Sequence, residues 1–202
     1  NFLFDLNLTG RIARSVPDIE HTPVVEVGPG PAGLTRAILM AGSPRLIAIE
    51  KDKTTMPILS QIIDASDGRL CVIYDDALRV DFSKLGLDKY AICANLPYNV
   101  GTELLIGWLH KIANGEQIVS MTLMFQREVA LRITSKPGDE HYGRLAVLTS
   151  LLADAKILFD VPNTAFVPRP KVQSAVVQII PNKEKIACIS NLAKIEQITA
   201  KL

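Results

Sequence analysis

Short β-branched runs alternate with helical stretches along most of this 202-residue chain. The alternation is typical of strand–helix–strand units, whose strands align in parallel and whose helices cover both faces of a sheet. The runs that fit strands are residues 24–27, 46–50, 70–74, 90–94 and 118–125. The stretches that fit helices are residues 34–41, 58–65 and 103–112, with a further helix from residue 128. This pattern predicts an open α/β sheet.

The second half of the chain has a different character. A helix is expected over residues 144–153, followed by strands at 156–160 and 173–180. The proline-punctuated segment 162–170 is too short for a helical crossover, so the two strands are expected to form a hairpin-like antiparallel pair at the end of the sheet. We therefore expect one domain over residues 1–182. Residues 183–202 resemble the opening of a further helical domain with no partner for their apolar face, which carries Ile186, Ile189, Leu192, Ala193 and Ile198.

Composition excludes few functions. The 22 Lys and Arg residues nearly balance 21 Asp and Glu residues, so the net charge of +1 does not indicate a polyanion partner. No apolar run approaches the roughly 18 residues of a membrane span, which favours a cytoplasmic protein. Cys71, Cys93 and Cys188 lack paired spacing, so we expect small buried hydrophobes and no disulfide or zinc site. Unclustered histidines argue against a metal, and Trp108 is expected in the core.

A glycine-rich turn, GPGPAG at residues 28–33, follows the first strand and opens a helix. Glu50 ends the next strand, 22 positions after Gly28, so the pair fits the site of a ribose-bearing cofactor. The turn alone does not separate NAD from S-adenosylmethionine. Glu26, within the first strand, and Asp76, after the third, favour a cationic sulfonium, because a pyrophosphate would be repelled by these carboxylates.

The tetrapeptide NLPY, residues 95–98, follows the fourth strand. It suits methylation of an exocyclic amine, whose nitrogen lone pair must be turned toward the methyl group. The Asn95 carboxamide oxygen and the Pro97 carbonyl are expected to accept the two N–H bonds of that amine. Tyr98 is expected to stack on the base, and such stacking contributes about 1–3 kcal/mol. The position at the carboxyl end of a strand is where open α/β sheets bind ligands.

Together with other segments of the chain, these motifs resemble a known family, the small-subunit ribosomal RNA adenine-N6,N6-dimethyltransferases. The resemblance covers nearly the whole chain. The matching segments are NFL at 1–3, VEVGPG at 25–30, IEKD at 49–52, DAL at 76–78, NLPYN at 95–99, MFQREVA at 124–130, YGRL at 142–145 and FVPRPKVQSAVV at 166–177. The last three runs are more specific than the glycine turn, which many cofactor-binding proteins share.

The resemblance implies a Rossmann-like class I S-adenosylmethionine-dependent methyltransferase. Its substrate would be two adjacent adenines near the 3′ end of 16S ribosomal RNA, each methylated twice at N6 during ribosome biogenesis. The small ribosomal subunit would be the partner, with no metal or membrane involved, and the protein would act as a monomer. Family members have a basic stretch before the position of Asn1 and a Lys- and Arg-rich helical domain beyond that of Leu202.

The resemblance also implies roles for individual residues. Asn1 and Leu3 would contact the cofactor, Gly28 and Gly30 would approach its amino-acid part, and Glu26 would face the sulfonium. Glu50 would hold the ribose, and Asp76 the adenine, with Asp75 as the second choice. Asn95 would lie between cofactor and target. Tyr98 and Phe166 would clamp the flipped base, so both rings should be partly exposed. Arg169 and Lys171 are the expected RNA contacts, and the other basic residues of the cleft would be Arg127, Arg132, Lys136 and Arg144.

Three alternatives remain at this stage. Methylation of a large-subunit RNA adenine is a nearby enzymatic function, which the YGRL and FVPRPKVQSAVV segments disfavour. A noncatalytic RNA-binding assembly or transcription factor would keep the fold without the chemistry, although the intact NLPY segment argues against this. An NAD oxidoreductase would need a catalytic His or Lys near a strand end, and the sequence offers no convincing candidate.

Overall fold

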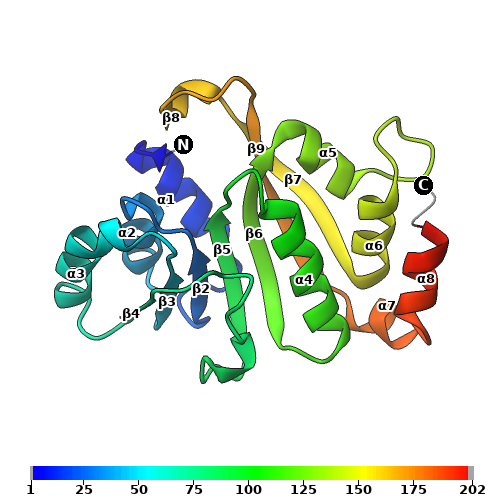
Figure 1. Cartoon of the computed structure of the whole chain (residues 1–202), viewed down its shortest axis with the longest axis horizontal. Helices are drawn as coiled ribbons and strands as arrows, with labels where there is room; N and C mark the ends of the chain where they lie inside the picture. The colour runs from blue at the N-terminus through cyan, green and yellow to red at the C-terminus, as the bar shows by residue number, and fades with distance from the viewer. Residues whose placement is uncertain (1, 200–202) are drawn as a thin grey trace.

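A seven-stranded sheet forms the centre of the molecule (Figure 1). The computed structural model describes residues 2–199, apart from the side chains of residues 193, 196 and 198. The strand order is β4-β3-β2-β5-β6-β9-β7. The strands are β2 (Val24–Val27), β3 (Leu46–Ile49), β4 (Leu70–Ile73), β5 (Tyr90–Asn95), β6 (Ile118–Gln126), β7 (Ala153–Val161) and β9 (Ser174–Pro181). The five strands expected from the sequence are confirmed within one or two residues at their ends.

The pairing of the strands creates a crevice beside β2. Strands β2 to β6 pair in parallel, and β2 lies between β3 and β5. The chain therefore winds outward in both directions from β2. In open α/β sheets, ligands bind outside the carboxyl ends of the strands at such a reversal. The expected α/β fold with a mostly parallel sheet is confirmed.

The antiparallel edge of the sheet is also confirmed, with a strand order that the sequence did not predict. Strand β9 pairs antiparallel with β7 on one side and with β6 on the other. The later strand is thus inserted between β6 and β7. Five of its eight residues are buried and none is exposed, whereas β7 has three exposed residues and is buried only at its two ends. The more apolar strand takes the inner position because both of its faces are then covered.

Helices cover the two faces of the sheet in separate groups. One apolar cluster joins α1 (Leu6–Arg14), α2 (Gly33–Met40) and α3 (Met56–Asp64) to one face. The other cluster joins α4 (Gly101–Ala113), α5 (Arg127–Thr134) and α6 (Arg144–Leu152) to the opposite face, with Trp108 in the core as expected. Short 3-10 turns lie at Lys53–Thr55, Phe82–Lys84 and Asn163–Ala165.

The first residues contain two elements that were not expected. Helix α1 is capped by Asp5, whose side chain accepts the Asn7 and Leu8 N–H groups. Its sequence, LNLTGRIAR, has an apolar face that buries Ile12 and Ala13, and the sequence interpretation overlooked this pattern. In front of it, β1 (Phe2–Leu3) pairs antiparallel with β8 (Phe166–Val167). This two-stranded ribbon connects the start of the chain to the segment between β7 and β9.

The C-terminal helices α7 (Lys183–Ala187) and α8 (Leu192–Thr199) lie beside α6 (Figure 1). Ile186, Ile189 and Leu192 are partly buried against the α4–α6 cluster. The expectation that this apolar face lacks a partner is therefore wrong for these three residues. The side chains of Ala193 and Ile198 lie outside the described residues. A separate domain beginning at residue 183 stays a prediction.

The cysteines differ from expectation at two positions. All three are free, and Cys93 is buried in β5, but Cys71 and Cys188 are exposed. Cys71 lies on β4, the strand at the edge of the sheet, which explains its incomplete cover. Within residues 2–199, no helix is long and apolar enough to cross a membrane. The described residues also contain no cluster of three or more His, Cys, Asp or Glu side chains suited to a metal ion.

Candidate active site

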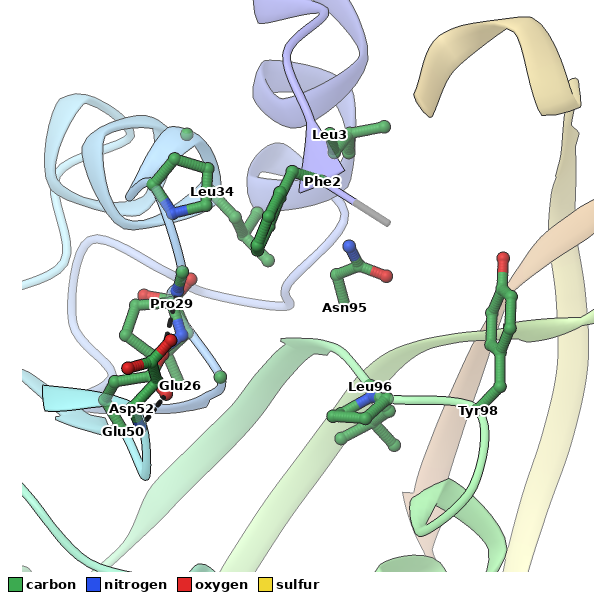
Figure 2. Close-up of a pocket in the computed structure, with 15 residues that line it drawn as sticks. Phe2, Leu3, Glu26, Pro29, Leu34, Glu50, Asp52, Asn95, Leu96 and Tyr98 are labelled. Atoms are coloured by element: carbon green, nitrogen blue, oxygen red, sulfur yellow. Dashed lines mark hydrogen bonds between the residues drawn. The ribbon is translucent and has the colours of Figure 1, made fainter. Parts of the chain in front are cut away.

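A pocket of about 280 Å³ lies where β2, β3 and β5 end (Figure 2). It occupies the crevice that the strand order creates beside β2. Its lining residues come from the start of the chain, the glycine turn, the end of β3 and the NLPY segment. They are Phe2, Leu3, Glu26, Gly28, Pro29, Gly30, Pro31, Gly33, Leu34, Glu50, Asp52, Asn95, Leu96, Pro97 and Tyr98. The fold thus brings together eight of the residues expected from the sequence.

The glycine turn has a backbone that other residues rarely adopt. Gly28 has a φ of 71° and Gly30 a φ of 52°, both in the left-handed region. A Cβ atom on Gly30 would lie 2.9 Å from Cε1 of Phe2. The side chain of Phe2 reaches down toward this turn, between Leu34 and Asn95 (Figure 2). The turn therefore allows close approach to the backbone at Gly28, while Phe2 from the start of the chain covers Gly30.

Glu50 ties the glycine turn to the end of β3. Its Oε2 accepts the Gly30 N–H at 3.0 Å, and its Oε1 accepts the Asp52 N–H at 2.8 Å. The side chain is 7% exposed and lines the pocket. A carboxylate has about four lone-pair sites, so each oxygen retains the capacity to accept a further hydrogen bond from a ligand hydroxyl.

Glu26 is buried at the bottom of the same pocket, with 1% of its surface exposed. Its Oε2 accepts the Thr35 hydroxyl at 2.7 Å. Burial raises the pKa of Glu26 to about 8, and the nearby charge of Glu50 adds to the rise. The carboxyl group is therefore largely protonated at neutral pH without a cation nearby. The cause is that desolvation outweighs the Thr35 hydrogen bond, and the expected place of Glu26 beside a sulfonium stays a prediction.

Asp76 lies outside the pocket lining. Its Oδ2 accepts the Lys51 Nζ at 2.8 Å, and its Oδ1 accepts the Leu78 N–H at 3.1 Å. These bonds, chiefly the one from Lys51, lower the pKa of Asp76. Asp75 is exposed, and its carboxylate accepts the Asp76 N–H. The carboxylate of Asp76 is thus the better fixed of the two, and its contact with a cofactor adenine stays a prediction.

Asn95 ends β5, is partly buried, and lies between Glu50 and Tyr98 (Figure 2). The carbonyl of Pro97 accepts two backbone N–H groups, from Val100 at 3.2 Å and Gly101 at 3.0 Å. A carbonyl oxygen has two lone pairs, so the start of α4 uses both. The expectation that the Pro97 carbonyl accepts a target amine is therefore wrong. Pro97 contributes instead by holding the NLPY segment at the beginning of the helix.

The two expected clamp residues differ. Tyr98 is partly buried and lines the pocket, in agreement with the expectation of partial exposure. Phe166 is 2% exposed and packs in the α1–α3 cluster, so the expectation of an exposed ring is wrong. The cause is the pairing of β8 with β1, which places Phe166 opposite Leu3. A preformed clamp of Tyr98 and Phe166 is absent from the described residues.

Other expected contacts have mixed outcomes. Leu3 is buried and lines the pocket, whereas Asn1 lies outside the described residues. Arg169 and Lys171 are exposed, and the Arg169 Nε donates to Asn163 Oδ1 at 3.0 Å. Arg127 pairs with Asp160 across 3.2 Å. Contacts of these basic side chains with RNA stay predictions.

Seven pocket residues carried no individual role in the sequence interpretation. They are Phe2, Pro29, Pro31, Gly33, Leu34, Asp52 and Leu96. Each lies within a segment that matches the family or within four residues of one, so proximity to those segments was the available signal. Proximity alone gives no direction for a side chain, which is why the position of Phe2 over Gly30 could not be read.

Comparison with known proteins agrees with this geometry. The chain matches the model of a family described as ribosomal RNA adenine dimethylase over residues 1–202. A protein from Rhizobium etli named ribosomal RNA small subunit methyltransferase A is 50% identical over 199 residues, covering 98% of this chain and 72% of the relative.

Solved structures give the same picture. A dimethyladenosine transferase from Plasmodium falciparum superimposes with a TM-score of 0.85 at 24% identity, covering 98% of this chain and 69% of that one. The 23S rRNA methyltransferase ErmE superimposes with a TM-score of 0.82 at 25% identity, covering 99% of this chain and 78% of that one. The fold of this chain is thus the Rossmann-like fold of these methyltransferases.

Proposed function

The chain belongs to the ribosomal RNA adenine dimethylase family, and from this premise we propose that it methylates adenine N6 atoms of small-subunit ribosomal RNA with S-adenosylmethionine. The targets are two adjacent adenines near the 3′ end, each receiving two methyl groups in the cytoplasm during subunit assembly. One observation carries the proposal: a single pocket joins the buried acids Glu26 and Glu50 to Asn95 and Tyr98. Cofactor-binding and amine-binding groups therefore share one cavity.

The pocket residues fit S-adenosylmethionine better than a dinucleotide. Glu26 and Glu50 both line the pocket and are buried, so a pyrophosphate would meet the Glu50 carboxylate and would disfavour ionisation of Glu26. A cation beside Glu26 would favour the ionised carboxylate and lower its raised pKa. The backbone at Gly28, where a Cβ atom would meet only Pro97 at 3.9 Å, allows close approach of an amino-acid group. Glu50 would accept the ribose hydroxyls.

When bound, S-adenosylmethionine supplies an electrophilic methyl group. The task of the chain is to hold the target amine so that its nitrogen lone pair faces that group. The Asn95 carboxamide oxygen would accept one N–H of the amine. Leu96 also lines the pocket, and its carbonyl receives no backbone hydrogen bond within residues 2–199, so it is the candidate for the second acceptor. Tyr98 would stack on the base after it leaves its RNA helix.

The comparisons favour the small subunit as the substrate. The Rhizobium etli relative, whose name specifies the small subunit, is 50% identical to this chain, whereas the 23S enzyme is 25% identical. A noncatalytic assembly factor is the second candidate, and the exposed Arg169 and Lys171 would serve either function. The pocket supports the enzyme, because RNA binding alone needs no buried acids beside an amine-binding segment.

The decisive experiment supplies radiolabelled S-adenosylmethionine and unmethylated small subunits to the full-length protein and to two variants. Asn95→Ala should lower turnover roughly a hundredfold, since it removes a contact that is strongest in the transition state. Its affinity for S-adenosylmethionine should change little. Asn114→Ala, a matched change at the exposed end of α4, should be as active as the unaltered protein.

Each outcome of this experiment has a separate meaning. If small subunits took up no label but large subunits in a parallel reaction did, the substrate would be assigned to the large subunit. Tight binding of small subunits without incorporation of label would favour the assembly factor. If Asn95→Ala transferred methyl groups at the normal rate, the role given to Asn95 would be wrong even though the enzymatic function would stand.

A further inference from the structure

The Tyr98 hydroxyl has a partner outside its own segment. It lies 2.8 Å from the Oγ atom of Ser174, within hydrogen-bond distance, and either hydroxyl can donate. Ser174 is 0% exposed, whereas Tyr98 is partly buried and lines the pocket. The two residues are 76 positions apart in the chain. The contact therefore connects the pocket to a distant strand.

Ser174 is held by strand pairing on both sides. It is the first residue of β9, which lies between β6 and β7, and it pairs with Gln126 on one side and Val161 on the other. Tyr98 belongs to the connection between β5 and α4, which is neither strand nor helix. A hydroxyl on a strand paired on both sides is thus a fixed anchor for a ring that stands on an irregular segment.

The anchor acts where orientation of the ring matters. Tyr98 is fixed at its backbone by the Pro97 carbonyl, which accepts the Val100 and Gly101 N–H groups, and at its far end by Ser174. With both ends held, rotation of the ring about its side-chain bonds is restricted. Stacking depends on the plane of the ring, so a ring that rotates freely holds a base less well.

We propose that Ser174 is a positioning residue for the target base, because its hydroxyl sets the orientation of the Tyr98 ring. The proposal rests on the proposed function and deepens it, since it assigns a role to a residue that does not line the pocket. It also predicts that Tyr98→Phe is impaired. Stacking alone does not require the hydroxyl, but orientation by Ser174 does.

The test uses the full-length protein with Ser174→Ala, Tyr98→Phe and the double variant. Each single change should lower kcat/KM for unmethylated small subunits by roughly fivefold to tenfold, the loss of one hydrogen bond. The KM for S-adenosylmethionine should be unaltered. The double variant should be no worse than either single variant, because both changes remove the same contact.

Ser120→Ala is the matched control. Ser120 is also a buried serine on a strand of the same sheet, and its hydroxyl has no hydrogen-bond partner within the described part of the chain. Its replacement should leave kcat/KM unchanged. If Ser174→Ala also matched the unaltered protein, or if its effect persisted in full on the Tyr98→Phe background, the proposal would be overturned.

A second measurement needs no activity. NMR of the protein labelled with ring-13C tyrosine gives a signal for Tyr98, assigned by its loss in Tyr98→Phe. Ser174→Ala should shift that signal and broaden or average it, and Ser120→Ala should not. An unchanged Tyr98 signal in Ser174→Ala would refute the anchoring. If the unaltered protein methylated no RNA, the proposed function would fail, while this spectrum would still decide whether Ser174 orients the ring.

Discussion

Replacement of Glu50 should reveal two roles in one side chain. The carboxylate accepts the Gly30 and Asp52 N–H groups, and it is expected to hold the cofactor ribose as well. A hydrogen bond to a charged group contributes about 1.5–3 kcal/mol to stability. Glu50→Gln keeps one carbonyl acceptor but turns an N–H₂ group toward the other backbone N–H, so we expect a loss of about 1.5–3 kcal/mol. Glu50→Ala removes both bonds.

The upper bound for Glu50→Ala is about 6 kcal/mol, twice the larger single value. The pocket is open to water, which can solvate the released N–H groups, so the expected loss is near the lower end, about 3 kcal/mol. Loss of the ribose contact should also weaken S-adenosylmethionine binding by roughly 10- to 150-fold. Glu103→Gln, an exposed change on α4, should alter stability by less than about 0.5 kcal/mol.

Urea unfolding followed by tryptophan fluorescence measures the stability, since Trp108 is the one tryptophan of the sequence and is buried in the core. Calorimetry measures the cofactor affinity. If both Glu50 variants unfolded at the same urea concentration as the unaltered protein, the hydrogen bonds from Gly30 and Asp52 to Glu50 would not contribute to the stability of the fold. A large loss of stability with unchanged affinity would show that Glu50 supports the turn without contacting the ribose.

Three further predictions concern Glu26, Gly33 and Phe166. Burial raises the pKa of Glu26 from an ordinary value of 4.5 to about 8, so the folded state holds a proton that the unfolded chain releases, and stability should fall as the pH rises through this window. Glu26→Gln should remove that decline in urea unfolding at several pH values. Gly33→Ala places a Cβ atom 2.8 Å from the Leu3 carbonyl oxygen and should weaken cofactor binding severalfold by calorimetry, whereas Gly107→Ala meets no atom within 4 Å and should raise the free energy of unfolding by up to about 1 kcal/mol. Phe166→Ala should lower the free energy of unfolding by about 3–5 kcal/mol, and a variant as stable as the unaltered protein would contradict the buried position of the ring.

The sequence by itself determined the strands, most helices and the place of the pocket. These features depend on local patterns: β-branched runs fix β2 to β6, and the glycine turn needs a left-handed backbone at Gly28 and Gly30. The carboxyl ends of parallel strands meet at one edge of a sheet, so the order of motifs along the chain was enough to bring Glu26, Glu50 and Asn95 together. Because the motifs follow successive strands and those strands run parallel, few other arrangements of these three residues are possible.

Only the tertiary structure decided how individual groups are used. The insertion of β9 between β6 and β7 depends on the burial of both of its faces, and it is this insertion that brings Ser174 to Tyr98. Pairing of β8 with β1 buried Phe166, although its motif indicated a ligand contact. Burial also raised the pKa of Glu26. Strand order, burial and hydrogen-bond partners arise from contacts between residues far apart in the chain, and no local pattern of residues specifies them.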